Sequence, residues 1–252
     1  MNYALLVDLH KGGARQGPGS ARHTELAIEL AGLTGAADTL KIADVGCGTG
    51  ASTLVLAERL NATITAVDLF PQFLNILKAK AGKKGLADKI RTLACSMDDL
   101  PFEENSLDAI WAEGAIYNLG FEKGVTYFKR FLKPGGILAA SEITWLIRDR
   151  PDEIASFWNR EYPEIATPAE KIGILEAQDF ILKGYFPLPE TCWIDHYYTP
   201  LQSRFEGFLA RHVTEEARAI VDADTNEIEL YKKYGRYYSY GFYIAQKAVG
   251  DS

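Results

Sequence analysis

The sequence predicts an α/β fold, in which a doubly wound sheet carries helices on both faces. Two observations support this prediction. Short apolar or β-branched segments alternate with segments of helical periodicity along residues 40–141, and such alternation is typical of parallel strands joined by right-handed crossovers. A glycine-rich turn at residues 44–50 follows the first predicted strand and precedes a helix. That layout is typical of a site where the backbone approaches a nucleotide-like ligand.

The individual elements follow from residue composition and from breaker residues. Strands are predicted at 40–45, 62–68, 90–95, 107–111, 137–141, 180–186 and 237–248. Ser20 is a suitable N-cap for a helix that ends near Gly32, and Pro71 fits the first turn of another helix. Further helices are expected at 51–60, 125–132, 151–158, 167–177, 200–212 and 215–233. Residues 1–19 are rich in glycine and are expected to be irregular.

The composition argues against several classes of function. A net charge of -7 disfavours broad binding to nucleic acid, because phosphate contacts need clustered lysine and arginine. The three cysteines are scattered, which fits a reducing compartment, and the four histidines form no metal-site pattern. No apolar run has the length of a transmembrane helix. We therefore expect a cytoplasmic protein without a membrane span, a bound metal or a nucleic-acid partner.

The ligand of the glycine loop is ambiguous by pattern alone, because Gly46, Gly48 and Ala51 also satisfy the dinucleotide fingerprint. Asp44 stands two residues before the first of these glycines. Its carboxylate would repel a pyrophosphate at the helix N-terminus, whereas it would favour the ammonium and sulfonium of S-adenosylmethionine. Asp44 could instead cap the loop by accepting backbone N–H bonds, and both roles can hold together.

Residues at the ends of the second and third predicted strands also bear on the choice between S-adenosylmethionine and a dinucleotide. Asp68 ends the second strand, where a carboxylate can accept both hydroxyls of a ribose, although NAD sites share this feature. A turn-forming role before Pro71 is the alternative for Asp68. After the third strand, Met97 could pack on an adenine ring while Asp98 accepts from its amino group. Together these residues favour S-adenosylmethionine over a dinucleotide.

These motifs occur together in a known family. The chain resembles the class I S-adenosylmethionine-dependent methyltransferases, of the small-molecule type that includes ubiquinone/menaquinone-biosynthesis and sterol methyltransferases. The matching segments are residues 44–50, 67–68, 97–102, 107–110 and 132–138. The resemblance implies a Rossmann-like seven-stranded sheet, mostly parallel with an antiparallel last strand, and S-adenosylmethionine as the cofactor. The predicted strand at 237–248 suits that last position.

The resemblance also implies roles for individual residues. The glycine loop would admit the methionine part of the cofactor, Asp68 would hold the ribose, and the turn after the fourth strand would line the sulfonium. Residues 16–20 resemble a glycine-rich lid found in some members, with a loop and helix cap as the alternative. The expected cofactor-binding residues are Gln16, Gly19, Asp44, Gly46, Cys47, Gly48, Gly50, Asp68, Leu69, Ser96, Met97, Asp98, Glu113 and Gly114.

A single domain is expected over residues 1–252, because no linker or repeat interrupts the chain. Residues 1–35 would supply the lid and N-terminal helices, and residues 36–142 the cofactor-binding core. Residues 143–235 are richer in proline and aromatic residues and would determine the acceptor. Residues 236–250 would hold the last strand.

The sequence does not identify the acceptor or a catalytic base. The methyl donor is already activated, so the protein needs mainly to align the reactants and exclude water. A base is needed only where the acceptor must lose a proton. Candidates for the acceptor pocket are Tyr117, Trp145, Tyr185, Trp193, Tyr197 and His196. The alternative for each aromatic residue is a place in the core, and for His196 it is packing or surface.

Three functions therefore compete. The leading one is a small-molecule methyltransferase, with a homodimer left open. The second is an NAD-dependent oxidoreductase, against which Asp44 and residues 97–102 argue. The third is a protein that binds S-adenosylmethionine without catalysis, and an intact glycine loop is compatible with it.

Overall fold

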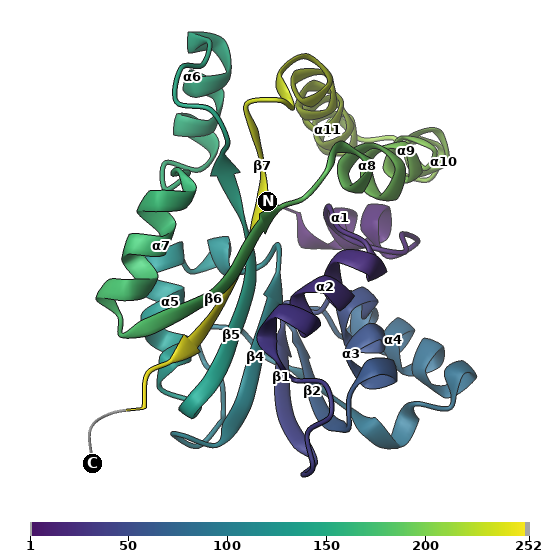
Figure 1. Ribbon diagram of the computed structural model, residues 1–252. Coiled ribbons are helices and arrows are strands. Elements are labelled where there is room, and N and C mark those ends of the chain that lie inside the picture. The colour runs from purple at the N-terminus through teal and green to yellow at the C-terminus, as the bar shows by residue number, and fades with distance from the viewer. Residues whose placement is uncertain (1, 250–252) are drawn as a thin grey trace.

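The computed structural model describes residues 2–249, and a seven-stranded sheet forms its middle layer (Figure 1). The strand order is β3-β2-β1-β4-β5-β7-β6. β7 runs antiparallel to both of its neighbours, and the other pairings are parallel. The strands are β1 (Leu40–Val45), β2 (Ala62–Asp68), β3 (Ile90–Ala94), β4 (Leu107–Glu113), β5 (Leu132–Trp145), β6 (Phe180–Pro187) and β7 (Tyr238–Lys247). All seven predicted strands and the antiparallel last strand are confirmed.

Helices cover both faces of the sheet. The longer ones are α1 (Tyr3–His10), α2 (Ala21–Ala31), α3 (Ala51–Arg59), α4 (Pro71–Lys84), α5 (Phe121–Lys129), α6 (Asp152–Glu161), α7 (Pro168–Ala177) and α11 (Glu215–Tyr234). In Figure 1, α2, α3 and α4 lie on one side of the sheet, and α5 and α7 lie on the other. Alternate residues of β1 enter the two cores: Ile42 packs with α2 and α3, whereas Ala43 packs with α5 and α7.

A further layer lies beyond the carboxyl ends of the parallel strands. It consists of α1, α11 and the short helices α8 (Glu190–Trp193), α9 (Thr199–Gln202) and α10 (Phe205–Arg211), which gather together in Figure 1. A separate apolar cluster joins Leu5 and Leu9 of α1 to Leu201, Phe208 and Val221. The order of the sheet reverses between β1 and β4, so this layer covers the edge at which such sheets bind their ligands.

Three predicted elements were wrong in detail. Residues 3–10 are helical rather than irregular, because Leu5 and Leu9 find apolar partners almost 200 residues away; so short a helix is not stable alone. Leu132 begins β5 instead of ending a helix, since it pairs with Leu107. The helix expected at 200–212 is interrupted at Arg204, whose guanidinium donates to the carbonyls of Leu9 and Pro200.

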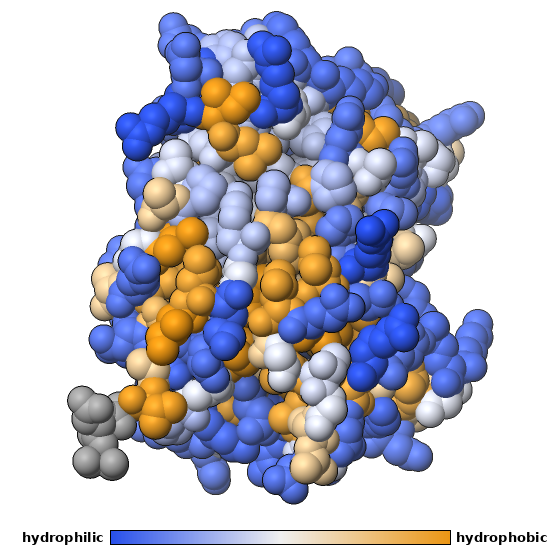
Figure 2. All heavy atoms as spheres, in the orientation of Figure 1, coloured by the Kyte–Doolittle hydropathy of each residue, from blue (hydrophilic) through white to orange (hydrophobic). Residues whose placement is uncertain are grey.

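The molecular surface is mixed in character. On the face drawn in Figure 2, hydrophobic side chains gather in the middle, over β6 and α2, and hydrophilic ones occupy the periphery. Within residues 2–249, no helix combines the length and the apolar character that crossing a bilayer requires.

Candidate functional site

The glycine loop joins β1 to α3 at the point where the strand order reverses. Gly46, Gly48 and Gly50 have φ angles of +72°, +55° and +87°, in the left-handed region that favours glycine. A Cβ at Gly46 would overlap the Cβ of Ala115, and one at Gly50 would overlap the side chain of Leu77. The loop therefore needs glycine both for its conformation and for its close packing.

Asp44 lies beneath this loop with a carboxylate that is 1% exposed. Its Oδ2 accepts from Ser52 Oγ at 2.8 Å and from Thr53 Oγ1 at 2.6 Å. Its Oδ1 is buried without a partner, which is a costly arrangement for a carboxylate. Burial raises the pKa of Asp44 to about 7. The partners are thus hydroxyls in the first turn of α3, rather than the backbone N–H groups considered from the sequence.

Asp68 ties the loop to the end of β2. Its Oδ2 accepts from the backbone N–H of Gly48 at 2.8 Å, and its Oδ1 accepts from that of Phe70 at 2.9 Å. Burial raises the pKa of its carboxyl group. The carboxylate orders the turn before Pro71 and also lines the neighbouring cavity, so the structure leaves room for both roles considered from the sequence.

Two adjoining cavities follow the carboxyl ends of β1, β2, β3 and β4. The larger has a volume of about 300 Å³ and the smaller about 70 Å³. Most of the predicted cofactor residues line one or both of them: Gln16, Gly46, Cys47, Gly48, Asp68, Leu69, Ser96, Met97, Asp98, Glu113 and Gly114. Gly19, Asp44 and Gly50 do not line either cavity. Asp44 sits one residue deeper, behind Ser52, which lines the smaller cavity.

The predicted lid lies across the glycine loop. Gln16 accepts from the backbone N–H of Thr49 at 2.8 Å through Oε1, and its Nε2 donates to the carbonyls of His10 and Gly13. Ser20 caps α2 by accepting from the backbone N–H of His23. The helix-cap role considered from the sequence is therefore present, and the preceding residues cover the loop as well.

Sequence reasoning missed Arg15, which anchors this segment. Its guanidinium forms an ion pair with Glu113, and both side chains are about nine-tenths buried. Glu113 also accepts from Thr24 Oγ1 at 2.7 Å and from Trp111 Nε1 at 2.9 Å. Glu113, which we expected to lie near the sulfonium, is thus paired with Arg15 of the segment that precedes α2. Arg15 belongs to no motif that the sequence analysis recognised. Only its position next to Gln16 in the predicted lid could have marked it as a site residue.

A third cavity, of about 230 Å³, adjoins the other two and shares Gln16, Gly114 and Tyr117 with them. We call it the aromatic cavity, and the ring-bearing residues that line it are Tyr117, Trp158, Tyr162, Trp193, Tyr197 and Tyr240. Tyr197 lies on a π-helical turn, Ile194–Tyr198, between α8 and α9. Four of the lining residues were not identified from the sequence: Trp158, Tyr162, Glu227 and Tyr240.

Three predicted acceptor residues do not line this cavity. Trp145 is 2% exposed and packs edge-on against Tyr238 in the core. Tyr185 packs against Tyr243 within the sheet. His196 is exposed on the outer side of the π-helical turn. Trp145 and Tyr185 are thus packed against other rings, and His196 lies outside the cavity, so we do not include them in the proposed acceptor site.

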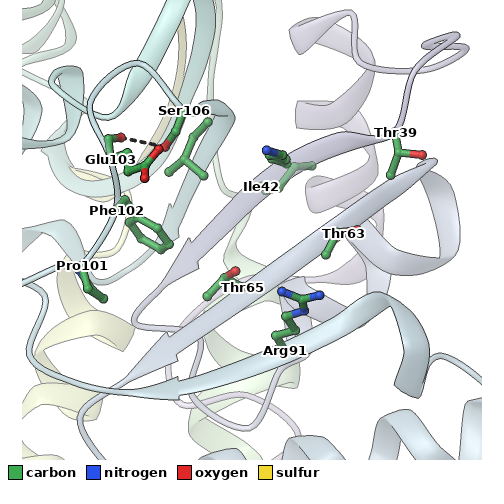
Figure 3. Close-up of a pocket in the computed structure, with 11 residues that line it drawn as sticks. Thr39, Ile42, Thr63, Thr65, Arg91, Pro101, Phe102, Glu103 and Ser106 are labelled. Atoms are coloured by element: carbon green, nitrogen blue, oxygen red, sulfur yellow. Dashed lines mark hydrogen bonds between the residues drawn. The ribbon is translucent and has the colours of Figure 1, made fainter.

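A further cavity lies at the opposite end of the strands (Figure 3). Its walls include Thr39 before β1, Thr63 and Thr65 in β2, Arg91 in β3 and the loop that carries Phe102. Its volume is about 440 Å³. It faces the amino halves of the strands, whereas open α/β sheets bind ligands beyond the carboxyl ends. We therefore place the candidate site at the glycine loop.

Comparison with known proteins agrees with this geometry. Residues 43–140 match the family model of a methyltransferase domain. A sterol 24-C-methyltransferase of Gibberella zeae is 32% identical over 130 residues, which are 51% of this chain and 33% of that protein. Residues 43–140 thus form a methyltransferase domain, and the chain is similar to sterol and ubiquinone/menaquinone-biosynthesis methyltransferases. The matched stretches cover between a third and about half of the length of the curated relatives.

Solved structures of this methyltransferase fold match nearly the whole chain. A methyltransferase of Geobacter sulfurreducens in complex with S-adenosyl-L-homocysteine aligns with a TM-score of 0.82 over 96% of this chain and 97% of that one, at 16% identity. The [4+2]-cyclase SpnF aligns with a TM-score of 0.77 over 98% and 93%, at 22% identity. These likenesses confirm the fold. The cofactor of the methyltransferase family is S-adenosylmethionine.

Among residues 2–249, no group of three or more histidine, cysteine, aspartate or glutamate side chains is arranged to hold a metal ion. Two features of the glycine loop suit a positively charged organic ligand. The buried, unpartnered Oδ1 of Asp44 suits a nearby positive charge, and the bare glycine backbone leaves room for a ligand.

Proposed function

We propose that this protein transfers the methyl group of S-adenosylmethionine to a small-molecule acceptor by in-line displacement. One observation carries the proposal. The cavities along the strand ends, which hold the expected cofactor residues, meet the aromatic cavity at Gln16, Gly114 and Tyr117. A donor in the first and an acceptor in the second would face each other across this junction.

The lining residues support an assignment of the cofactor's parts. Asp68 would accept from the ribose hydroxyls, and Met97 and Asp98 would hold the adenine. The smaller cavity, between Gly46 and Gly114, would take the methionine part, with the charge of Asp44 behind Ser52 favouring its ammonium.

The sulfonium supplies an activated methyl group when it is bound. The proposed reaction therefore requires mainly that the protein align the donor with the acceptor and exclude water. Gln16 and the Arg15–Glu113 ion pair hold residues 11–20 over the glycine loop, where they would exclude water. We propose that residues 1–35 close the site, that residues 36–142 bind the donor and that residues 143–235 select the acceptor. Residues 236–250 contain the last strand.

Calorimetry with S-adenosylmethionine, S-adenosylhomocysteine and NAD tests the proposal. We expect both sulfur ligands to bind with micromolar affinity and NAD to bind at least about a hundredfold more weakly, since a pyrophosphate would lie near Asp44. Preferential binding of NAD would overturn the methyltransferase proposal. Binding without methyl transfer to any member of an acceptor panel would instead favour the non-catalytic alternative.

Donor affinity should depend on pH through Asp44. Its pKa is raised to about 7 by burial, so the carboxylate is ionised above that pH and neutral below it. An ammonium favours the ionised form. We expect the affinity for S-adenosylhomocysteine to fall about three- to tenfold from about pH 8 to about pH 6, measured by calorimetry at constant ionic strength. Asp44→Asn should bind with the weaker affinity throughout, and an equal pH slope in this variant would contradict the assignment.

A further inference from the structure

The aromatic cavity has an unusual balance of charge. Its lining includes the carboxylates of Glu161 and Glu227 but no lysine, arginine or histidine side chain. Glu161 is exposed and pairs with Arg160, so its charge is largely screened. Glu227, on α11, is the carboxylate that the protein encloses.

Glu227 is only partly satisfied by the protein. Its Oε1 accepts from the hydroxyl of Tyr198 at 2.8 Å, while Oε2 has no hydrogen-bond partner among the described residues. Asp224, one turn earlier on α11, adds a second carboxylate whose Oδ2 is buried without a partner. Burial raises the pKa of both groups, and each lies close enough to acidic neighbours to be raised further. No cation among the described residues compensates these two carboxyl groups, and a bound cation would favour their ionised form.

The remaining walls are rings and phenol hydroxyls. Trp193 and Trp158 are largely buried and present apolar surface, and Tyr117, Tyr197 and Tyr240 add phenol hydroxyls to the lining. Because Glu227 lines the same cavity as these three tyrosines, the four groups converge on one space. Ring faces attract a cation by about 0.5–2 kcal/mol each when water is excluded.

We infer that the acceptor is a small molecule carrying a cationic amine or quaternary ammonium group, held among the rings of the aromatic cavity with Glu227 as its counter-charge. This inference rests on the proposed function, because it names the acceptor class of the same site. A neutral sterol or sugar would leave Glu227 without a counter-charge, although Tyr198 would still donate a hydrogen bond to it. An anionic acceptor would be repelled by the same carboxylates.

A matched pair of probes tests this inference directly. Choline carries a quaternary ammonium group, and 3,3-dimethyl-1-butanol is its neutral isostere; both are small enough for a cavity of about 230 Å³. We expect choline to bind the protein saturated with S-adenosylhomocysteine at least about tenfold more tightly than the isostere, measured by calorimetry and by quenching of tryptophan fluorescence. Equal affinities, or no detectable binding of choline, would overturn the inference.

Glu227→Gln provides the variant, since glutamine keeps an acceptor for Tyr198. This substitution should reduce the ratio of the affinity for choline to the affinity for 3,3-dimethyl-1-butanol by at least about fivefold. Asp222→Asn is the matched control, because Asp222 lies exposed on the same helix, and its preference should equal that of the wild type. Circular dichroism and the affinity for S-adenosylhomocysteine are recorded for each protein. A wild-type preference for choline that survives Glu227→Gln intact would contradict the role of Glu227.

The outcomes separate the two proposals. If S-adenosylhomocysteine does not bind, the probes are compared on the free protein; a preference for choline there would overturn the proposed function and leave the cation site standing. Donor binding without a preference for choline would overturn the cation site alone. Methylation of a neutral acceptor at equal rates by the wild type and Glu227→Gln would also reject the cationic class.

Discussion

Replacing Glu142 by alanine should lower the free energy of unfolding by about 3–5 kcal/mol, because it would leave a buried ammonium without its counter-ion. Glu142 of β5 and Lys171 of α7 are at most 1% exposed, with Nζ 3.4 Å from Oε1. Lys171 Nζ also lies 4.4 Å from the centre of the Phe121 ring. Burial raises the pKa of Glu142 and lowers that of Lys171, so each group depends on the other for its charge.

Urea denaturation followed by circular dichroism measures this effect. Glu176→Ala is the control, since Glu176 is exposed on the same helix as Lys171, and it should change the free energy of unfolding by less than about 0.5 kcal/mol. The double variant Glu142→Leu with Lys171→Met should recover most of the stability, because apolar side chains of similar volume replace the pair. A loss below about 1 kcal/mol in Glu142→Ala would show that water reaches Lys171.

Replacing Gly46 by alanine should weaken donor binding by about ten- to a hundredfold, which corresponds to roughly 1.4–2.7 kcal/mol. Gly46 has a φ of +72°, where a side chain is strained. The added methyl group would overlap the Cβ of Ala115 and lie 3.5 Å from Cε of Met97. It would therefore push apart the two strand ends between which we place the donor.

The control for this variant is Gly82→Ala. Gly82 lies within α4, where a Cβ would meet no atom within 4 Å, and alanine in a helix is favoured by about 0.5–1 kcal/mol over glycine. Calorimetry with S-adenosylhomocysteine should therefore find wild-type affinity and a slightly raised melting temperature. Unchanged affinity in folded Gly46→Ala would place the donor elsewhere.

The cofactor-binding residues could be predicted from the sequence because each group of them lies within a short segment. Each parallel strand ends in its own motif: Asp44 and the glycines after β1, Asp68 after β2, and Met97 with Asp98 after β3. Parallel strands bring these ends to one edge of the sheet, so separate local motifs become one cavity. The same locality explains why strand positions were predicted well.

Most residues of the aromatic cavity could not be predicted from the sequence, because no short sequence pattern contains them. Trp158 comes from α6, Tyr197 from a π-helical turn, Glu227 from α11 and Tyr240 from β7. Each residue alone looks like core or surface. Their convergence depends on how the helices after β5 pack above the strand ends, a choice made by contacts between residues far apart in the chain.

By itself the sequence predicted the α/β fold and an S-adenosylmethionine site, since hydrophobic periodicity and short strand-end motifs encode both within a few residues. Only the tertiary structure decided that residues 3–10 form a helix, that Arg15 pairs with Glu113, and that a carboxylate and a set of aromatic rings line one cavity. The physical reason is that burial and charge compensation are properties of the packed molecule. They depend on which side chains exclude water from one another, and a sequence motif does not specify that.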